Sequence, residues 1–317
     1  DHGVHTGNNH GVLTDPECTW GFLARADHRD GQYETMSTYR ALDYYWDKLI
    51  YVDTRVNELS GTREIRDVAV DYNDDVYVVG YANASFEIGN SVAAKFDNPD
   101  QFAFESGYSW LSGNVDRMFV AKYDTKGMCQ WSTVLSGEDI DANSLHICID
   151  DDDLYVSSAI IGLDTGISSL SGVNIHKLDI STGDIDWIHH TTVTGLCKVH
   201  DIELVEGHGP MITGEFTGSV TVPTGDVRGS TSTSKIHTVS TGLYVAVDPS
   251  GVTQSFGHGD STSPSNCVTS VTNYKTGNQL ILGTTTSDTS FYSQAREGLI
   301  GNSTNKQTTY TMTHDTY

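Results

Sequence analysis

The sequence predicts an all-β fold built from a repeated four-stranded unit, and three observations carry this prediction. Short runs of alternating apolar and polar residues recur along the chain, with the spacing of half-buried strands. A hairpin pattern occurs at residues 118–134, 174–190 and 243–257, with a fainter copy at 21–35. The composition, with 31 Gly and 6 Pro beside many Val, Ile, Tyr and Thr, is typical of a β protein with many turns.

The hairpin at 174–190 reads NIHKLDISTGDIDWIHH and defines the pattern. An alternating strand ends at Asp179, a tight turn closes at Gly183, and a second alternating strand carries Trp187. Turn glycines recur in the other three hairpins, at intervals that one four-stranded sheet plus insertions would fill. The hairpin is therefore expected to be the outer half of a repeating sheet.

Two further alternating runs, joined by an acidic turn, precede each complete hairpin. In the N-terminal part, strands are expected at 21–27 and 44–52, and the one stretch with helical spacing falls near 38–49. Beyond residue 283 the sequence becomes a Ser/Thr-rich tail without a clear hairpin. The remaining inner pairs are expected at 65–71 and 76–80, at 145–149 and 154–156, at 199–205 and 211–214, and at 267–273 and 280–283.

Four-stranded sheets of this kind have two apolar faces and cannot bury either face alone. Radial stacking covers both faces and leaves only short edges, so the repeat predicts a β-propeller of four-stranded antiparallel blades, either complete or an excerpt of a larger propeller. The expected organisation is a single propeller domain or part of one, with a lead-in and half blade at 1–63, blades at 64–140, 141–196 and 197–260, and a half blade with the Ser/Thr-rich tail at 261–317.

Two of the hairpins resemble known propeller repeats. KLDISTGDIDW (177–187) and AKYDTKGMCQW (121–131) resemble the pyrroloquinoline-quinone-type repeat, in which an Asp-x-x-Thr-Gly turn leads to a docking Trp. Residues 118–137, with their neighbouring VYVVG strand, also resemble the bacterial-type seven-bladed propeller repeat. The resemblance implies that the Trp of each segment packs on the adjacent blade. Two hairpins depart from the pattern: the third has Ser255-Phe256 where the Trp would stand, and the first has Thr35.

The charge balance limits the classes of partner. The chain has 42 Asp and Glu against 18 Lys and Arg, a formal net charge of −24. Nucleic acid and anionic membrane surfaces need a basic face, so neither is an expected partner. The sequence has no run of 18 apolar residues, and membrane insertion is not expected. The expected partners are other protein subunits, with glycans as a second class.

Several features point to an extracellular or cell-surface protein. Asn83-Ala-Ser and Asn302-Ser-Thr match the acceptor triplet for N-glycosylation. The sequence begins without Met or a signal, which indicates a processed product or a piece of a longer chain. Five cysteines allow two disulfides at most, and Cys197 and Cys267 are the first candidate pair because they occupy equivalent first strands.

Candidate residues for chemistry are few. The acidic turns offer Asp71, Asn73, Asp75, Asp150 and Asp152 as oxygen ligands for calcium, the one cofactor considered, although neither turn has the spacing of a calcium hand. No catalytic or other cofactor-binding residues are expected, because the sequence lacks a nucleophile elbow, a phosphate loop and a Cys-x-x-Cys pair.

The leading functional hypothesis is a non-enzymatic structural or protein-interaction module of a cell-surface or filamentous assembly. Its polar insertions at 83–116 and 219–240 are expected to project as partner contacts. One alternative is a propeller enzyme, quinone-dependent or carbohydrate-active, with its site in a central channel. Another is a carbohydrate-binding module that uses an aromatic surface, namely Phe102, Phe104, Tyr108 and Trp110.

Overall fold

A computed structural model describes 15 segments of the chain. They are 21–27, 43–50, 62–83, 116–125, 129–137, 139–150, 152–163, 170–205, 209–223, 231–233, 236–259, 264–272, 279–285, 291–295 and 308–314. The chain divides into two compact units, Asp1–Val134 and Leu135–Tyr317. Within the described segments, no helix has the length and apolar character that crossing a membrane requires.

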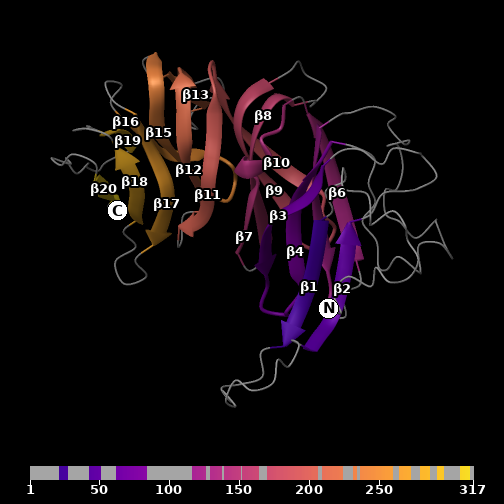
Figure 1. The fold of residues 1–317 in the computed structure, drawn as a ribbon. Coiled ribbons are helices and arrows are strands. Elements are labelled where there is room, and N and C mark those ends of the chain that lie inside the picture. The colour runs from indigo at the N-terminus through magenta and orange to yellow at the C-terminus, as the bar shows by residue number, and fades with distance from the viewer. Residues whose placement is uncertain are drawn as a thin grey trace, which may run out of the picture. The chain divides into compact units, whose positions relative to one another are not determined.

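The first unit contains a hairpin and a four-stranded antiparallel sheet (Figure 1). Strands β1 (Gly21–Asp27) and β2 (Asp43–Ile50) pair with each other, so residues 43–50 are a strand and the helical turn considered there is wrong. The sheet, termed the β3–β6 sheet, has the order of the sequence: β3 (Arg63–Val70), β4 (Val76–Ala82), β5 (Asp116–Tyr123) and β6 (Cys129–Gly137).

The second unit contains three antiparallel sheets. The β7–β10 sheet comprises β7 (His146–Asp150), β8 (Asp153–Leu163), β9 (Leu170–Asp179) and β10 (Ile185–Val193). The β11–β16 sheet comprises β11 (Cys197–Val205), β12 (Gly209–Gly218), β15 (His237–Val247) and β16 (Thr253–Gly259). The β17–β20 sheet comprises β17 (Ser265–Thr272), β18 (Gln279–Thr285) and β20 (Thr308–His314). The first two sheets confirm the predicted four-stranded order.

Two strands leave the sheet of their flanking strands and pair with the preceding sheet; they are termed the crossing strands. β13 (Val220–Pro223) pairs with β10 and with β14 (Thr231–Thr233). β19 (Phe291–Ala295), which lies between β18 and β20 in sequence, pairs with β16. The insertion at 219–240 therefore does not simply project, because part of it extends the neighbouring sheet. The C-terminal tail likewise contains two strands that the sequence pattern did not predict.

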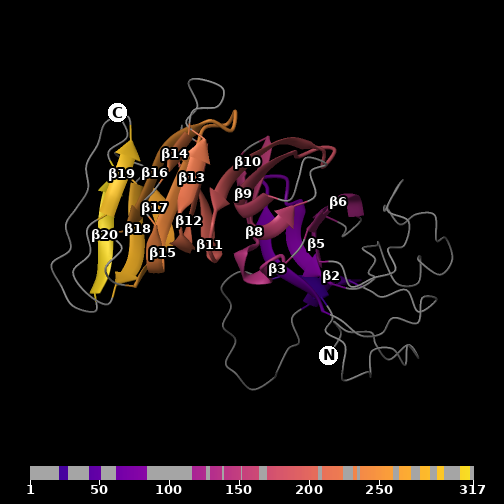
Figure 2. The ribbon, with the colours of Figure 1, turned by 90° about the horizontal axis from the view of Figure 1, so that it is seen from above.

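The sheets of the second unit pack face to face around apolar cores. Tyr155, Val173 and Ile175 of the β7–β10 sheet meet Ile212 and Val245 of the β11–β16 sheet in the main buried cluster. On the other face of the β11–β16 sheet, β17 packs across β11, β12 and β15 (Figure 2). Face-to-face burial of this kind is what alternating apolar strands require.

The predicted docking of Trp187 is confirmed at the first of these interfaces. The Trp187 Nε1–H donates to the backbone oxygen of Pro249 at 3.1 Å. Gly251 adopts φ 84°, and a Cβ built there would lie 2.9 Å from the Trp187 ring. Glycine is therefore required twice at this turn, for its backbone conformation and for the close approach of the indole. The turn glycine Gly183 also has positive φ, at 77°.

Candidate functional site

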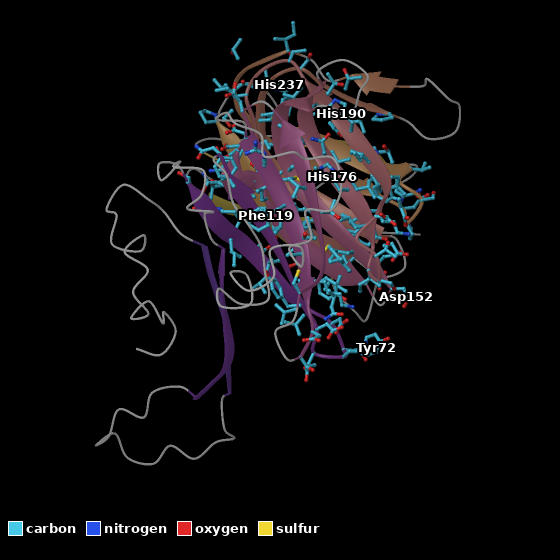
Figure 3. All side chains as sticks on the ribbon, turned by 90° about the vertical axis from the view of Figure 1, so that its right-hand side faces the viewer. Tyr72, Phe119, Asp152, His176, His190 and His237 are labelled. Atoms are coloured by element: carbon cyan, nitrogen blue, oxygen red, sulfur yellow. The ribbon has the colours of Figure 1, made fainter. Side chains whose placement is uncertain are left out.

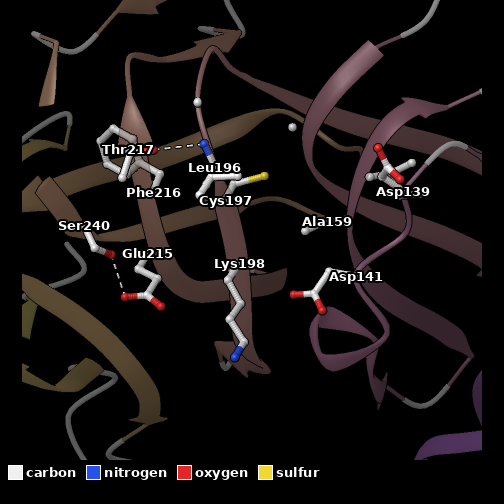
Figure 4. Close-up of a pocket in the computed structure, with 13 residues that line it drawn as sticks. Asp139, Asp141, Ala159, Leu196, Cys197, Lys198, Glu215, Phe216, Thr217 and Ser240 are labelled. Carbon is white, nitrogen blue, oxygen red and sulfur yellow. Dashed lines mark hydrogen bonds between the residues drawn. The ribbon is translucent and has the colours of Figure 1, made fainter. Parts of the chain in front are cut away.

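The candidate site is a groove of about 420 Å³ between the β7–β10 and β11–β16 sheets. It lies where β7 and β11 begin, and Figure 3 places His190 and His237 at this end of the unit and Asp152 at the opposite end. We term it the interblade groove. Its lining residues are Asp139, Asp141, Ala159, Ile160, Gly172, Gly195, Leu196, Cys197, Lys198, Glu215, Phe216, Thr217 and Ser240 (Figure 4). Its volume is within the range of small-ligand sites in proteins.

One side of the groove is fixed by the 3-10 helix η5 (Ala142–Ser144). Asp141 is its N-cap, and its carboxylate accepts hydrogen bonds from the Asn143 backbone N–H at 3.1 Å and from the Ser144 hydroxyl at 2.8 Å. The Ser144 Oγ in turn accepts a hydrogen bond from the Val199 N–H on β11 at 2.9 Å. A chain of hydrogen bonds thus connects this carboxylate to the neighbouring sheet and holds its position.

The opposite side of the groove carries Glu215 on β12. The Ser240 hydroxyl donates to its Oε2 at 2.7 Å, and His200 Nε2 lies 3.5 Å from its Oε1. His200 is the extra residue of a bulge between Val199 and Asp201, two residues after the cross-strand partner of Glu215. These contacts, from His200 first, lower the pKa of Glu215, while partial burial opposes them. Glu215 is therefore a fixed anionic group.

Strand β11 contributes Lys198 and Cys197 to the groove. Lys198 pairs with Glu215 in the strand register, and its charge also lowers the pKa of that carboxyl. Burial, together with the negative charge of Asp141, raises the pKa of the Cys197 thiol to about 12. Because only a thiolate is an effective nucleophile, Cys197 is an apolar part of the wall.

The lowered pKa of Glu215 and the raised pKa of Cys197 indicate which chemistry the groove favours. A carboxylate with a lowered pKa is a poor general acid, and a thiol with a raised pKa is a poor nucleophile. The groove instead combines fixed negative charge with an apolar floor that contains Ala159, Ile160 and Phe216. Such a surface is suited to binding an amphipathic cation.

The predicted disulfide is not formed in the structure. In the structure Cys197 is a thiol and not half of a disulfide. Cys267 lies in β17, and its side chain is outside the described part of the chain. The two strands do belong to neighbouring sheets, as the prediction required, since β17 packs against β11.

The calcium candidates use their oxygen atoms as turn formers. The Asp71 Oδ1 accepts hydrogen bonds from the backbone N–H groups of Asn73 at 2.8 Å and of Asp75 at 2.9 Å. Asp150 and Asp152 lie at the exposed turn between β7 and β8. No group of three His, Cys, Asp or Glu side chains converges as metal ligands would in the segments that the structure describes. Calcium binding stays a prediction.

The glycosylation and carbohydrate-binding residues are only partly described. Asn83 is half-buried after β4, and its Oδ1 accepts a hydrogen bond from the Thr62 N–H at 2.7 Å. The Asn83 side chain also hydrogen-bonds Tyr81, so the amide that a glycan would modify takes part in local contacts. Asn302 and the aromatic residues at 102–110 lie outside the described segments. Both hypotheses therefore stay predictions.

The sequence reasoning missed the residues of the interblade groove. Asp139, Asp141 and Glu215 belong to no motif and are far apart in the sequence. A usable signal was nevertheless present. In antiparallel order, the start of each first strand and the end of each second strand lie at one end of a sheet. Charged residues at those positions, such as Lys198 and Glu215, are therefore expected to meet.

Residues 59–87 match a family model described as a β-propeller repeat. The matched residues include β3, the acidic turn and β4, which are the first two strands of the β3–β6 sheet. A comparison with curated proteins gives no match. The same four-strand order recurs in the β7–β10 and β11–β16 sheets. The chain is therefore an all-β, β-propeller repeat protein built of four-stranded antiparallel blades.

Proposed function

We propose that this β-propeller repeat protein is a non-enzymatic, extracellular protein-interaction module and a subunit of a cell-surface or filamentous assembly. The interblade groove is the observation that carries the proposal. It collects loops and strand ends from two packed blades, and binding sites in proteins commonly use loops that a rigid scaffold positions. A protein-interaction role is also typical of propeller repeat domains.

The extracellular location is supported by composition. A net charge of −24 suits a salty medium, where screening limits self-repulsion. The acceptor residue Asn83 lies at the end of β4 and keeps part of its surface exposed. We also propose the finer resemblance to seven-bladed and pyrroloquinoline-quinone-type repeats, supported by the Asp179–Gly183 turn and the docked Trp187.

Labelling intact cells of the source with an antibody against this chain tests the proposal. The expected result is surface labelling without permeabilisation, together with crosslinking of the chain to other protein subunits. Labelling only after permeabilisation, or a purified chain that crosslinks to nothing at the surface, would contradict it. Treatment with an N-glycosidase provides a further check, because loss of mass would show that an acceptor such as Asn83 is modified.

The enzyme and carbohydrate-binding alternatives need separate tests. Substrate turnover in the presence of quinone and calcium, abolished by a chelator, would favour the enzyme. Binding to a panel of immobilised glycans would favour the carbohydrate-binding module.

A further inference from the structure

We infer that the interblade groove binds an arginine side chain of the protein partner; this inference rests on the proposed function and names the partner's chemistry. Among the described residues, three carboxylates line the groove, those of Asp139, Asp141 and Glu215, and one ammonium, that of Lys198. The whole chain is strongly acidic as well, at −24. Charge complementarity therefore favours a cationic occupant and steers a basic partner towards this surface.

The shape of the lining favours a cation with a long aliphatic stem. Between the charged residues, the wall is built from Ala159, Ile160 and Phe216, which are buried apolar residues of the two blades. Arginine and lysine bury their methylene groups along such surfaces and keep the charged head among polar groups.

The carboxylates favour a guanidinium as the charged head. Each carboxylate has about four lone-pair positions that can accept hydrogen bonds. Asp141 accepts from Asn143 and Ser144. Glu215 accepts from Ser240, so both carboxylates can still accept further hydrogen bonds. Asp139 is exposed at the rim of the groove, in a left-handed conformation with φ 47°. A guanidinium presents five N–H donors in a planar fork and is more weakly hydrated than an ammonium, so it matches several acceptors from different elements.

Lys198 defines where the guanidinium lies. It is the cross-strand partner of Glu215, so part of the Glu215 charge is already compensated. The imidazole of His200 also lies beside Glu215, with Nε2 3.5 Å from Oε1. The uncompensated negative charge is consequently on the other side, at Asp139 and Asp141. The guanidinium is expected to contact these two carboxylates, with Glu215 contributing at longer range.

The surroundings of the groove favour a protein chain over a small amine. Leu196, which lines the groove, is 75 % exposed, and Ile236 is 76 % exposed. The two residues lie in one neighbourhood, because Leu196 donates its N–H to Thr217 Oγ1 and the residue after Ile236 pairs with Gly218. Large apolar side chains beside a polar site are typical of protein-binding surfaces. They would contact the residues that flank the arginine.

The experiment is a calorimetric titration of the intact chain with the capped peptide Ac-Gly-Leu-Arg-Leu-Gly-amide. Matched peptides carry citrulline, the uncharged isostere, or lysine at the central position. We expect binding of the arginine peptide, at least about tenfold weaker binding of the lysine peptide, and no measurable binding of the citrulline peptide. Equal affinity for arginine and citrulline would overturn the inference, as would no heat change up to about millimolar peptide.

Variants locate the site. Asp139→Asn removes the exposed rim carboxylate, and we expect it to weaken binding of the arginine peptide about tenfold. Asp152→Asn removes the same charge at the opposite end of the β7–β10 blade, and we expect less than about a twofold change. Equal effects of the two variants would place the binding elsewhere and overturn the inference. Glu215→Gln, checked for folding by thermal unfolding, is expected to have an intermediate effect.

Crosslinking the Asp139→Asn chain at the cell surface separates this inference from the proposed function. If the variant still crosslinks at the cell surface and the parent chain does not bind the peptide, the arginine inference is overturned. The proposed function then stays intact. Loss of surface assembly for the parent chain would overturn the proposed function itself.

Discussion

The β7–β10 and β11–β16 blades present different side chains to the blade that follows each of them. In the first, Trp187 packs on the Pro249–Gly251 turn of the next blade, with the Tyr155 ring beside it at 6.0 Å between centroids. In the second, the strand register places Ser255 at the position of Trp187, and Met211 at that of Tyr155. The same structural unit is thus built with two different interface surfaces.

The charged residues around these positions differ in the same way. Lys177 forms an ion pair with Asp153 at 2.9 Å, and the Tyr155 hydroxyl donates to the same carboxylate. The corresponding residue of the β11–β16 blade is Ala246, in an apolar cluster that also includes Met211 and, from β18, Ile281. The β3–β6 blade has the same set of side chains, namely Tyr77, Lys122, Asp75 and Trp131.

The comparison teaches that the Tyr–Lys–Trp set is a device for one kind of interface and not a requirement of the blade. Its Trp needs a following turn with glycine at the contact, as Gly251 provides. Where the Trp is replaced by Ser255, smaller apolar residues fill the interface instead.

Acid is expected to weaken the β7–β10 blade through its buried imidazoles His176 and His189. Burial, and then the charge of neighbouring His190, lowers the pKa of His176 to about 3, and burial lowers that of His189 to about 4 despite its contact with the Gly251 oxygen. Both values lie below the unfolded value of 6.5, so the stability is present above pH 6.5 and is lost as the pH falls. The two residues together should lower the free energy of unfolding at pH 5 by about 4 kcal/mol relative to pH 8.

Chemical denaturation at pH 8 and pH 5 measures this loss. His189→Gln removes one of the two imidazoles, and it should roughly halve the difference in free energy of unfolding between the two pH values. An unchanged difference would show that His189 titrates normally in the folded protein.

Trp187→Ala is expected to destabilise the protein by about 3 kcal/mol, because it removes the indole from the turn and deletes the bond to Pro249. Ser255→Ala is the matched change at the equivalent position of the next blade and should cost less than about 0.5 kcal/mol. Urea denaturation of both variants gives the two values. Equal costs would mean that the indole does not stabilise the interface.

Gly251→Ala is expected to cost about 2 kcal/mol, from the positive φ and from the contact of the new Cβ with the Trp187 ring. The part due to contact should disappear when Trp187 is already alanine. A double-mutant cycle by urea denaturation therefore separates the two causes. Additive costs would show that Gly251 is needed only for its backbone conformation.

Lys177→Ala copies the β11–β16 blade, which has Ala246 at this position, and it is expected to cost about 1 kcal/mol. Part of this cost is electrostatic, so it should shrink in high salt. Thermal unfolding at low and high ionic strength measures both. A cost that salt leaves unchanged would assign the effect to the packing of the lysine stem.

The strands and the hairpin turns could be predicted from the sequence because their signals are local. Alternation placed β9 and β10, and the spacing from Asp179 to Trp187 predicted the docked indole. β13 and β19 could not be predicted in the same way, because their partners belong to the preceding sheet and lie outside the repeat. Pairing of that kind depends on which sheets are neighbours, which local alternation does not encode.

The residues of the groove could not be predicted from local sequence patterns for a related reason. Asp141 and Glu215 are adjacent only after two blades have packed, and neither belongs to a recognisable motif. The bulge at His200 adds one residue to β11, and the alternation pattern does not reveal it. At the acidic turns the sequence did suggest a site, a calcium site that includes Asp71. In the structure the Asp71 carboxylate forms hydrogen bonds within the turn.

The crossing strands have a consequence for how such a gene can be cut and rearranged. Because β13 completes the edge of the β7–β10 sheet, a recombination point between Val193 and Cys197 separates this sheet from a strand that pairs with it. The β11–β16 sheet would lose β19 in the same way at a cut before Ser265. If a segment with the boundaries of the sequence repeat were duplicated or deleted, one sheet would lose its edge strand. The neighbouring segment would then carry a strand that has no sheet to pair with. In this chain, the unit of duplication and the unit of folding are offset by one strand.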